Sequence, residues 1–344
     1  PGYIIGHSLE REGMSQKNLS ERTGLTEKHI SQIINGEASI TVETALLLEN
    51  ALGGQASFWI NLEKNFQETR ARLERSDLLK KEVSLATKYP YAELVKREYI
   101  EQTSNKEKRV ENLWKFFGVN SLEYIQNTEV VAYRKKSGSG IKSESIATWL
   151  RCGELESRKA NLSEYSEQKL KESLVKIKHL TTKKPEEFSS QVVSILNNAG
   201  ISLVYTPHFS GTGVSGAVRW VGNNPLIQLS LYGSFLDIFW FNLFHEIGHL
   251  VLHGKKEKFI EFNNRDLSSV QDKEKEADKF ASNELIPEKS YLEFLENGLT
   301  KQGIINFAQD LGVHPSIIAG RLCHDKKVKW NMVSALRPRL KFIQ

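Results

Sequence analysis

The stretch FWFNLFHEIGHLVLH, residues 239–253, is the most informative part of the chain. Its many apolar residues indicate a buried helix, and His245 and His249 stand four residues apart within it. Because residues four apart lie on one face of a helix, both imidazoles can bind the same metal ion. Glu246 lies one step round the helix, beside such an ion, where it suits a general base for a metal-bound water. The pattern predicts a hydrolytic metal site.

The segment EKEADKFASNELIP, residues 274–287, follows as an amphipathic helix with acidic residues on one face. A carboxylate from this helix would complete a site of two histidines and one carboxylate, with the fourth position open to water. We predict Glu276 as this ligand, with Glu274 and Asp278 as competitors. A merely solvated acidic helix face is the alternative.

Three candidate strands precede the metal-binding helix, separated by glycine-containing turns. They are ISLVYTP (201–207), SGAVRWV (215–221) and PLIQLSL (225–231). A peptidase usually holds its substrate as an added strand on an exposed sheet edge. Gly213, Ser215 and Gly216 leave space beside the second strand for another backbone. A sheet that only supports the helix is the alternative.

The residue that would stabilise an oxyanion has no clear sequence signal, and Tyr232, Arg219 and His253 are the candidates. His253 lies four residues beyond His249 and could face the same way. We expect it to support a ligand or to end the helix rather than to act as a fourth ligand. Asp278, Ser215 and Gly216 are further candidates for supporting or substrate-binding residues.

The segment SQKNLSERTGLTEKHISQIING, residues 15–36, predicts a helix-turn-helix. Ser15 and Thr26 can cap two short helices, and Gly24 stands where the turn needs a residue tolerant of positive φ. The small Ser20 lies where the helices cross. Ile30, Ile33 and Ile34 repeat at helical spacing, as in the motif whose second helix enters the DNA major groove. A protein-interaction bundle with the same packing is the alternative.

Contacts with double-stranded DNA are expected from the outward residues of this motif. Phosphate contacts are expected from Gln16, Lys17 and Lys28, and base contacts from Thr26, Glu27, Lys28, Ser31 and Gln32. Residues 1–80 hold nine Lys and Arg against eleven Asp and Glu, so the region is not basic overall. DNA binding would therefore depend on local donors. Dimerisation is expected, because such units usually bind paired half-sites.

The composition is that of a folded protein, with 39% hydrophobic and 26% charged residues over 344 positions. Polar residues interrupt the most apolar stretch, Leu226 to Leu252, so it does not predict a membrane span. Cys152 and Cys323 form no paired motif and fit a reducing compartment. With no secretory signal in the first residues, we expect a cytoplasmic protein.

The motifs divide the chain into four regions and predict a multi-domain, mostly α protein. We expect a five-helix helix-turn-helix domain at 1–75, a helical connector at 76–165, an α+β metallopeptidase domain with a small sheet at 166–298 and a helical C-terminal segment at 299–344. No repeat and no motif that carries chemistry occurs in the connector.

The order and spacing of these motifs resemble the HigA-type antitoxin regulators that carry an ImmA/IrrE-like metallopeptidase domain. The similarity covers nearly the whole chain. It includes the helix-turn-helix, ITVETALLLENALGGQASFWINLE (40–63), SGAVRW (215–220), FWFNLFHEIGHLVLH, EKEADKFASNELIP and FAQDLGVHPSIIAGRL (307–322). The resemblance implies a peptidase of the gluzincin type, with zinc, or else manganese, held by His245, His249 and Glu276 and with Glu246 as base.

The resemblance also implies biological roles. The N-terminal domain would bind an operator as a repressor, and the peptidase domain would cleave a regulatory protein, either the chain itself or a partner. A toxin would be a further partner. The alternative is a non-catalytic antitoxin and autorepressor, whose second domain is a metal-stabilised scaffold or sensor. A DNA-processing metalloenzyme is disfavoured, because no additional carboxylate cluster for magnesium is evident.

Overall fold

The computed structural model describes residues 1–126, 142–231, 234–254, 267–296 and 299–341. The chain divides into two compact units, Pro1–Val83 and Ser84–Gln344. Each unit is built around a hydrophobic core of its own. Within the described ranges, none of the helices is both long enough and apolar enough to cross a membrane.

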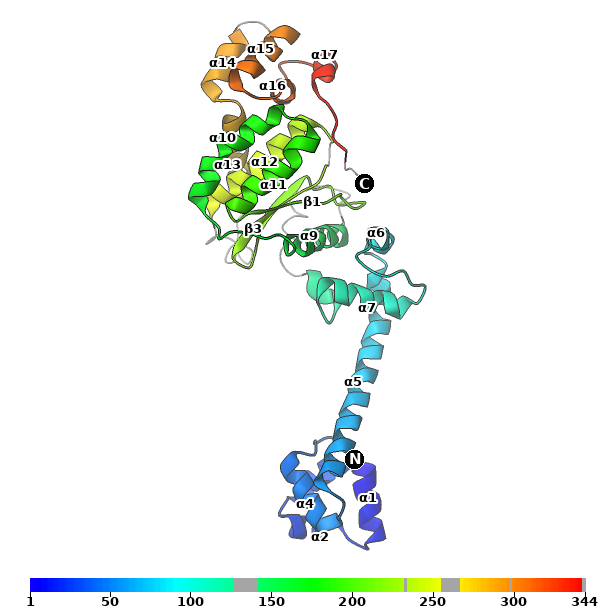
Figure 1. The fold of residues 1–344 in the computed structure, drawn as a ribbon. Helices are drawn as coiled ribbons and strands as arrows, with labels where there is room; N and C mark the ends of the chain where they lie inside the picture. Colours follow the sequence, from blue (N-terminus) through cyan, green and yellow to red (C-terminus); the bar gives the residue numbers. More distant parts are fainter. Residues whose placement is uncertain (127–141, 232–233, 255–266, 297–298, 342–344) are drawn as a thin grey trace. The chain divides into compact units, whose positions relative to one another are not determined.

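Five helices build the N-terminal unit, as the sequence predicts. They are α1 (Gly2–Arg11), α2 (Gln16–Thr23), α3 (Glu27–Ile34), α4 (Val42–Leu52) and α5 (Ala56–Ala86), the last of which runs into the second unit. Leu19, Ile30, Ile33, Leu48 and Trp59 are buried together in the core between them. Figure 1 shows the first four helices in blue around the start of α5.

The predicted capping residues define the helix-turn-helix. The Ser15 side chain accepts a hydrogen bond from the Asn18 backbone N–H, and Thr26 does the same for His29. Gly24 ends α2 with a φ of 75°, a left-handed conformation that costs a residue with a Cβ more than it costs glycine. The Ser20 hydroxyl donates to the Leu25 carbonyl within this turn. The local predictions for this motif are confirmed.

Helices surround a small sheet in the C-terminal unit. The helices before the sheet are α6 (Tyr91–Lys96), α7 (Lys106–Phe117), η1 (Leu122–Gln126), α9 (Ser143–Ser157), α10 (Glu167–His179), η2 (Leu180–Thr182) and α11 (Pro185–Asn198). Those after it are α12 (Leu236–His253), α13 (Leu267–Leu285), α14 (Glu288–Glu296), α15 (Lys301–Leu311), α16 (Pro315–His324), α17 (Trp330–Val333) and η3 (Ser334–Leu336).

The sheet consists of β1 (Ser202–Tyr205), β2 (Gly216–Val221) and β3 (Asn224–Leu229) in the order β1-β3-β2. β1 runs parallel to β3, whereas β2 is antiparallel to it, with Ala217 opposite Gln228. Among the strands of the described ranges, β2 therefore lies at an edge of the sheet. Helices α11 and α12 cover one face of the sheet and α9 covers the other (Figure 1).

Helix α9 is fastened to the sheet by buried polar groups. Trp149 Nε1 donates to the Thr206 carbonyl at 3.0 Å, and Gln228 Nε2 donates to the Trp149 carbonyl at 2.6 Å. Gly153 provides the necessary space, since a Cβ there would lie 2.0 Å from the Gln228 side chain. Residues 143–157, assigned to the connector by the sequence, thus form a layer of the sheet domain.

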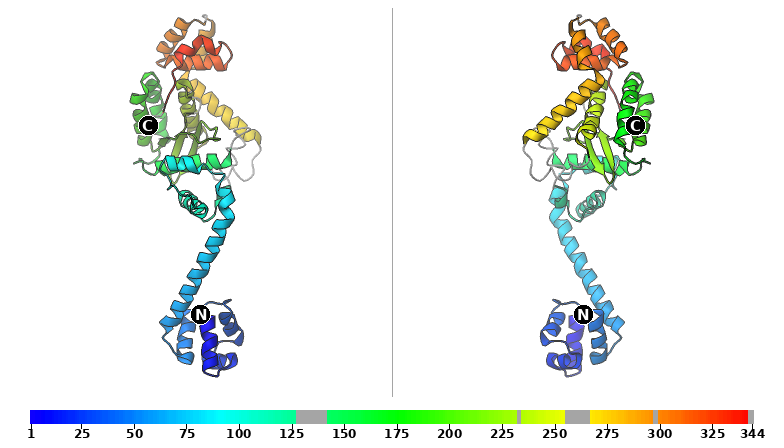
Figure 2. Two further views of the ribbon diagram at one scale, coloured as in Figure 1. Left: turned by 90° about the vertical axis from the view of Figure 1, so that its right-hand side faces the viewer. Right: turned by 90° about the vertical axis from the view of Figure 1, so that its left-hand side faces the viewer.

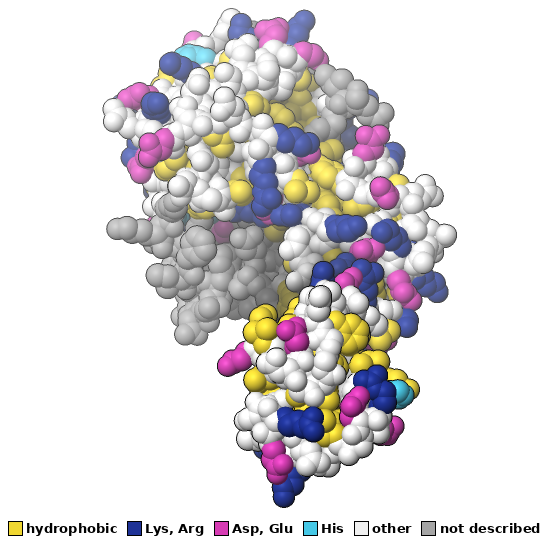
Figure 3. Space-filling view, turned by 60° about the horizontal axis from the view of Figure 1, so that its bottom comes forward, with side chains coloured by type: hydrophobic (Ala, Val, Ile, Leu, Met, Phe, Trp, Pro, Cys, Tyr) yellow, Lys and Arg dark blue, Asp and Glu magenta, His cyan; other side chains and the backbone are white. Residues whose placement is uncertain are grey.

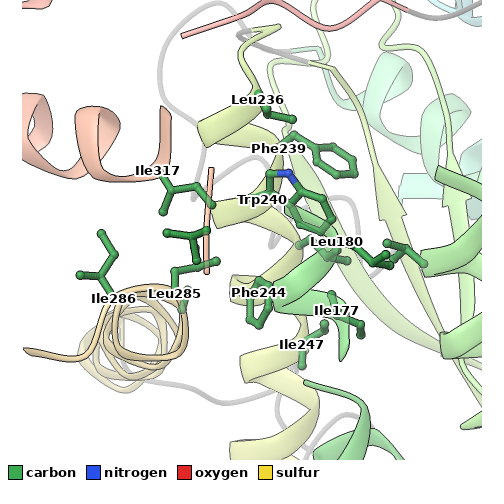
Figure 4. Close-up of a cluster of buried hydrophobic side chains, with 14 of the residues drawn as sticks. Ile177, Leu180, Leu236, Phe239, Trp240, Phe244, Ile247, Leu285, Ile286 and Ile317 are labelled. Carbon is green, nitrogen blue, oxygen red and sulfur yellow. The ribbon is translucent and has the colours of Figure 1, made fainter. Parts of the chain in front are cut away.

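The central element of this unit is α12, which is buried over most of its length. Figure 4 shows Phe239, Trp240, Phe244 and Ile247 of α12 among side chains from α10, α13 and α16. The side views in Figure 2 show α13, in gold, crossing beside α12, and these two helices contact each other extensively. The helix that carries the predicted metal ligands therefore sits in a rigid, closely packed environment.

The first turn of α12 is held by the C-terminal segment. Asp237 Oδ2 accepts hydrogen bonds from Arg337 Nε at 3.0 Å and Arg337 Nη2 at 2.6 Å, and each side chain is 7% exposed. The guanidinium also lies over the Phe235 and Trp330 rings. Backbone bonds join Leu236 to Pro338 and Leu340 to Ser234 beside this ion pair.

Candidate metal centre and nucleic-acid interface

His245 and His249 face the same point from successive turns of α12. Their Nε2 atoms lie 3.1 Å apart. The carboxylate of Glu274 on α13 reaches both nitrogens, with Oε2 3.4 Å from His245 Nε2 and Oε1 3.4 Å from His249 Nε2. Of the described residues, these three form the cluster that could hold a metal ion.

Glu276, the ligand that we predicted, lies elsewhere. Its side chain is 63% exposed, and its Oε2 lies 3.8 Å from His253 Nδ1 rather than beside His245 and His249. Residues two apart on a helix are rotated by about 200° around its axis, so their side chains point to nearly opposite sides. Because Ala277 and Ala281 face the core, Glu274 lies on their side of α13 and Glu276 does not. The prediction of Glu276 is wrong, and its competitor Glu274 occupies the position.

The spacing of the three donors fits zinc. Tetrahedral zinc with bonds of about 2.0–2.1 Å separates its ligand atoms by about 3.3–3.4 Å. The two Nε2 atoms lie 3.1 Å apart, and each lies 3.4 Å from one of the two carboxylate oxygens of Glu274. Two imidazole nitrogens and one carboxylate are also the donor types that zinc prefers when a fourth position stays open. The residues present therefore fit this ion.

Asp278 orients the first histidine. Its Oδ1 lies 2.8 Å from His245 Nδ1. A proton on Nδ1, donated to this carboxylate, leaves the Nε2 lone pair free to bind a metal. Asp278 follows Glu274 by four residues, so one face of α13 supplies both a ligand and the group that orients another ligand. The role of Asp278 in supporting the site stays a prediction, for which this contact supplies a physical basis.

Gly248 allows α13 to approach α12 closely enough to deliver Glu274. A Cβ at position 248 would lie 2.9 Å from Phe280 Cδ1 and 3.4 Å from the Ala277 Cα. A larger residue would push the two helices apart. The glycine of the HEIGH motif thus sets the distance between the ligand-bearing helices.

Glu246 is buried beside the cluster, with 5% of its surface exposed. It packs against Gly216 at the start of β2, where a Cβ would come within 2.6 Å of Glu246 Oε1. An open pocket of about 290 Å³ exposes this carboxylate together with His245 and Glu274. A buried carboxylate that faces an open pocket next to potential metal ligands can take up a proton from a molecule bound there.

The loop before β2 forms the opposite wall of this pocket. Its residues Gly213, Val214, Ser215 and Gly216 all line the cavity. Ser230 holds the loop, because its N–H donates to the Ser215 carbonyl at 2.9 Å and its hydroxyl donates to the Val214 carbonyl at 2.7 Å. The structure therefore places the predicted substrate-binding residues Ser215 and Gly216 at the pocket.

The candidates for oxyanion stabilisation do not line this pocket. Arg219 points to the other face of the sheet, where it donates to the Leu150 carbonyl of α9. His253 lies beyond His249, near Glu276. Tyr232 lies outside the described residues. The proposals for Arg219 and His253 are corrected, because the strand pleat and the helix length carry them away from the pocket.

Two residues that α12 brings to the pocket wall have no counterpart in the sequence predictions. Phe241 and Asn242 lie one turn before His245 and Glu246 and line the cavity. Their spacing of three to four residues from the HEIGH motif could have indicated a shared helix face. The opposite wall of the pocket, however, comes from residues 213–216, which lie much earlier in the chain.

The predicted DNA contacts lie on the surface of α2 and α3. Gln16, Lys17, Glu27 and Lys28 are exposed, while Ser31 and Gln32 are half-buried. Thr26 is exposed too, although its hydroxyl caps α3. Acidic and basic side chains are interspersed over the face in Figure 3, in keeping with the near balance of charges in residues 1–80.

Comparison with protein families matches two segments of the chain. Residues 9–59 match the helix-turn-helix family, and residues 233–322 match a peptidase family described as the IrrE N-terminal-like domain. The chain combines these two domains. No curated protein and no solved structure gave a match.

The IrrE N-terminal-like segment contains the whole cluster of His245, Glu246, His249, Glu274 and Asp278. It runs from the start of α12 into α16, so it also includes residues of the predicted C-terminal segment. The sheet and the pocket loop at 213–216 precede it. The helix-turn-helix segment includes α2, α3 and α4, together with the exposed residues predicted to contact DNA.

Proposed function

We propose that this protein is a DNA-binding transcriptional regulator whose C-terminal unit is a zinc-dependent peptidase. The observation that carries the proposal is the cluster of His245, His249 and Glu274, whose ligand atoms lie within 4.8 Å of one another beside the buried Glu246 and an open pocket. Zinc bound there would polarise a peptide carbonyl and lower the pKa of a water ligand to about 7.

Glu246 acts as the general base in this proposal. Its carboxylate takes a proton from the attacking water and passes it to the leaving nitrogen. Gly216 and the surrounding core keep Glu246 in one position, which limits the reorganisation needed during the reaction. Asp278 acts only by orienting His245.

The substrate would bind as an extended chain along β2. Main-chain groups of an antiparallel strand point alternately toward the partner strand and away from it. The Ser215 carbonyl points toward β3, because it accepts a bond from Ser230 N. Gly216 and Val218 therefore direct their N–H and C=O groups to the free edge. A peptide that pairs with them would pass beside Glu246.

The cleaved protein would be a regulatory protein, either this chain or a partner. Operator binding as a homodimer would place the regulator next to the gene that cleavage controls. The competing function is a HigA-type antitoxin with a toxin partner and a non-catalytic metal-stabilised domain. The buried Glu246 beside an open pocket favours the enzyme, because a purely structural zinc site needs no such base.

Metal content and peptide cleavage test the peptidase. We expect about one zinc per chain in the wild type, none in His249→Ala and Glu274→Ala, and full zinc in Glu276→Ala, the matched control on the same helix. Glu246→Gln should keep zinc but lose cleavage of a peptide library. Cleavage that survives in Glu246→Gln would rule out this mechanism and favour the non-catalytic alternative.

The DNA-binding part is tested with sequences selected from a random duplex pool. Lys28→Ala and Gln32→Ala should each weaken binding to the selected sequence by about 1–3 kcal/mol. Lys64→Ala on α5, outside the helix-turn-helix, is the control. Unchanged binding in both α3 variants would place recognition on another surface.

A further inference from the structure

Asn242 presents an unused hydrogen-bonding group to the pocket. It precedes His245 by three residues and Glu246 by four, so the three side chains lie on one face of α12 and all line the cavity. The Asn242 side chain is half-buried, and its carboxamide has no hydrogen bond within the described ranges of the chain. A carboxamide offers two N–H donors and one acceptor oxygen.

A peptide bound along β2 needs partners on both of its edges. One edge pairs with the outward main-chain groups of Gly216 and Val218. The N–H and C=O groups of the alternate residues point the other way, away from β2, and would lose hydrogen bonds to water without replacements. Other side chains of the pocket must therefore supply a donor and an acceptor.

The other polar side chains that α12 and α13 bring to the pocket have different tasks. His245 and Glu274 belong to the metal cluster, Asp278 orients His245, and Glu246 is the proposed base. Arg219 and His253 do not line the cavity. Asn242 is the polar residue of the helix wall that remains for the peptide.

We infer that Asn242 contacts the substrate, with its carboxamide bound to the peptide main chain on the edge opposite β2. This inference rests on the proposed peptidase function and deepens it, since it identifies the substrate as an extended segment held by main-chain bonds on both edges. Because all peptides share the same main-chain groups, Asn242 contributes to the affinity for an extended peptide and little to the specificity for particular substrate side chains.

Binding of two hydroxamates to the zinc-loaded protein tests this role without requiring turnover. Acetohydroxamate contacts the metal alone, whereas an N-acetyl dipeptide hydroxamate also carries a peptide main chain. In Asn242→Ala we expect the Kd of the dipeptide compound to rise about five- to tenfold and that of acetohydroxamate to stay within about twofold. Asn242→Asp should bind the dipeptide compound weakly too, because a carboxylate cannot donate a hydrogen bond.

The control is Asn283→Ala, an exposed asparagine on α13 that should change neither Kd. Unchanged dipeptide binding in both Asn242 variants would overturn the inference and leave the peptidase proposal intact. Equal weakening of both hydroxamates would also overturn it, because Asn242 would then act on the metal site. A wild type that holds no zinc would instead overturn the proposed function, and the metal analysis made before the titration identifies that case.

Discussion

Asp278 contacts a candidate metal ligand, His245, and lies outside the candidate metal cluster itself. Through the 2.8 Å contact with His245 Nδ1, its carboxylate would hold the ring and favour a proton on Nδ1. Asp278→Asn should therefore weaken zinc binding about 10–100-fold. The measurement is competition with a chelator of known affinity. Asp272→Asn, an exposed residue on the same helix, is the control, and equal zinc affinities for the two variants would contradict the role of Asp278.

Gly216 controls the position of Glu246, the proposed general base. A methyl group at this residue would lie 2.6 Å from Glu246 Oε1 and 3.1 Å from Leu229 Cδ2. Gly216→Ala should displace the Glu246 side chain and lower kcat at least tenfold. Complete loss of a general base typically costs about 10²–10⁴-fold, and the displaced carboxylate should lose part of that contribution. Zinc content should stay at the wild-type level. Loss of zinc in this variant would mean that the loop supports the ligands rather than the base.

The sequence predicted the residues of one helix better than those that two helices bring together. His245, Glu246 and His249 follow from helical spacing alone. The third ligand needed the rotation of α13, and Ala277 and Ala281 contained that information, since Glu274 continues their buried face by one turn. Asn242 could not be predicted as a pocket residue, because the opposite wall is a distant loop.

Elements were predicted more completely than their contacts. The three strands and the capped helices of the helix-turn-helix follow from local signals such as Ser15, Gly24 and Thr26. The packing of α9 on the sheet could not be predicted, since it depends on Gln228 reaching a carbonyl 79 residues earlier in the chain. Sheet order likewise depends on long-range pairing.

The ion pair between Asp237 and Arg337 joins the start of α12 to the C-terminal segment. Burial raises the pKa of Asp237, and hydrogen bonding and charge from Arg337 oppose this rise. Arg337→Met should leave a buried, unpaired carboxylate and destabilise the C-terminal unit by about 3–5 kcal/mol. Urea unfolding measures the loss. The double variant Asp237→Asn, Arg337→Met should recover part of it.

The pH dependence of this variant follows from the same pair. Without Arg337 the pKa of Asp237 rises further above its unfolded value. Such a group contributes stability below its unfolded pKa, and this contribution is lost as the pH rises through the folded pKa. The deficit of Arg337→Met relative to wild type should thus be smaller at about pH 4 than at about pH 8. A deficit independent of pH would assign the effect to lost packing on Phe235 and Trp330.

At the scale of the whole molecule, the two units have separate cores, and the candidate metal centre lies within one of them. A metal that binds only the folded state raises the free energy of unfolding. At a free metal concentration of 100 times its Kd, the increase is about 2.7 kcal/mol. Chelation should therefore lower the unfolding temperature of the C-terminal unit by about 5–10 °C. The transition of the N-terminal unit should not move.

Calorimetry with and without a chelator, together with DNA titration of the same samples, measures this separation. We expect DNA affinity to be unchanged by chelation, because α2 and α3 belong to the other unit. His249→Ala, which should not bind zinc, is the control and should not respond to the chelator. A chelator-dependent change in DNA affinity would instead show that the metal centre regulates the helix-turn-helix directly, without cleavage of any protein.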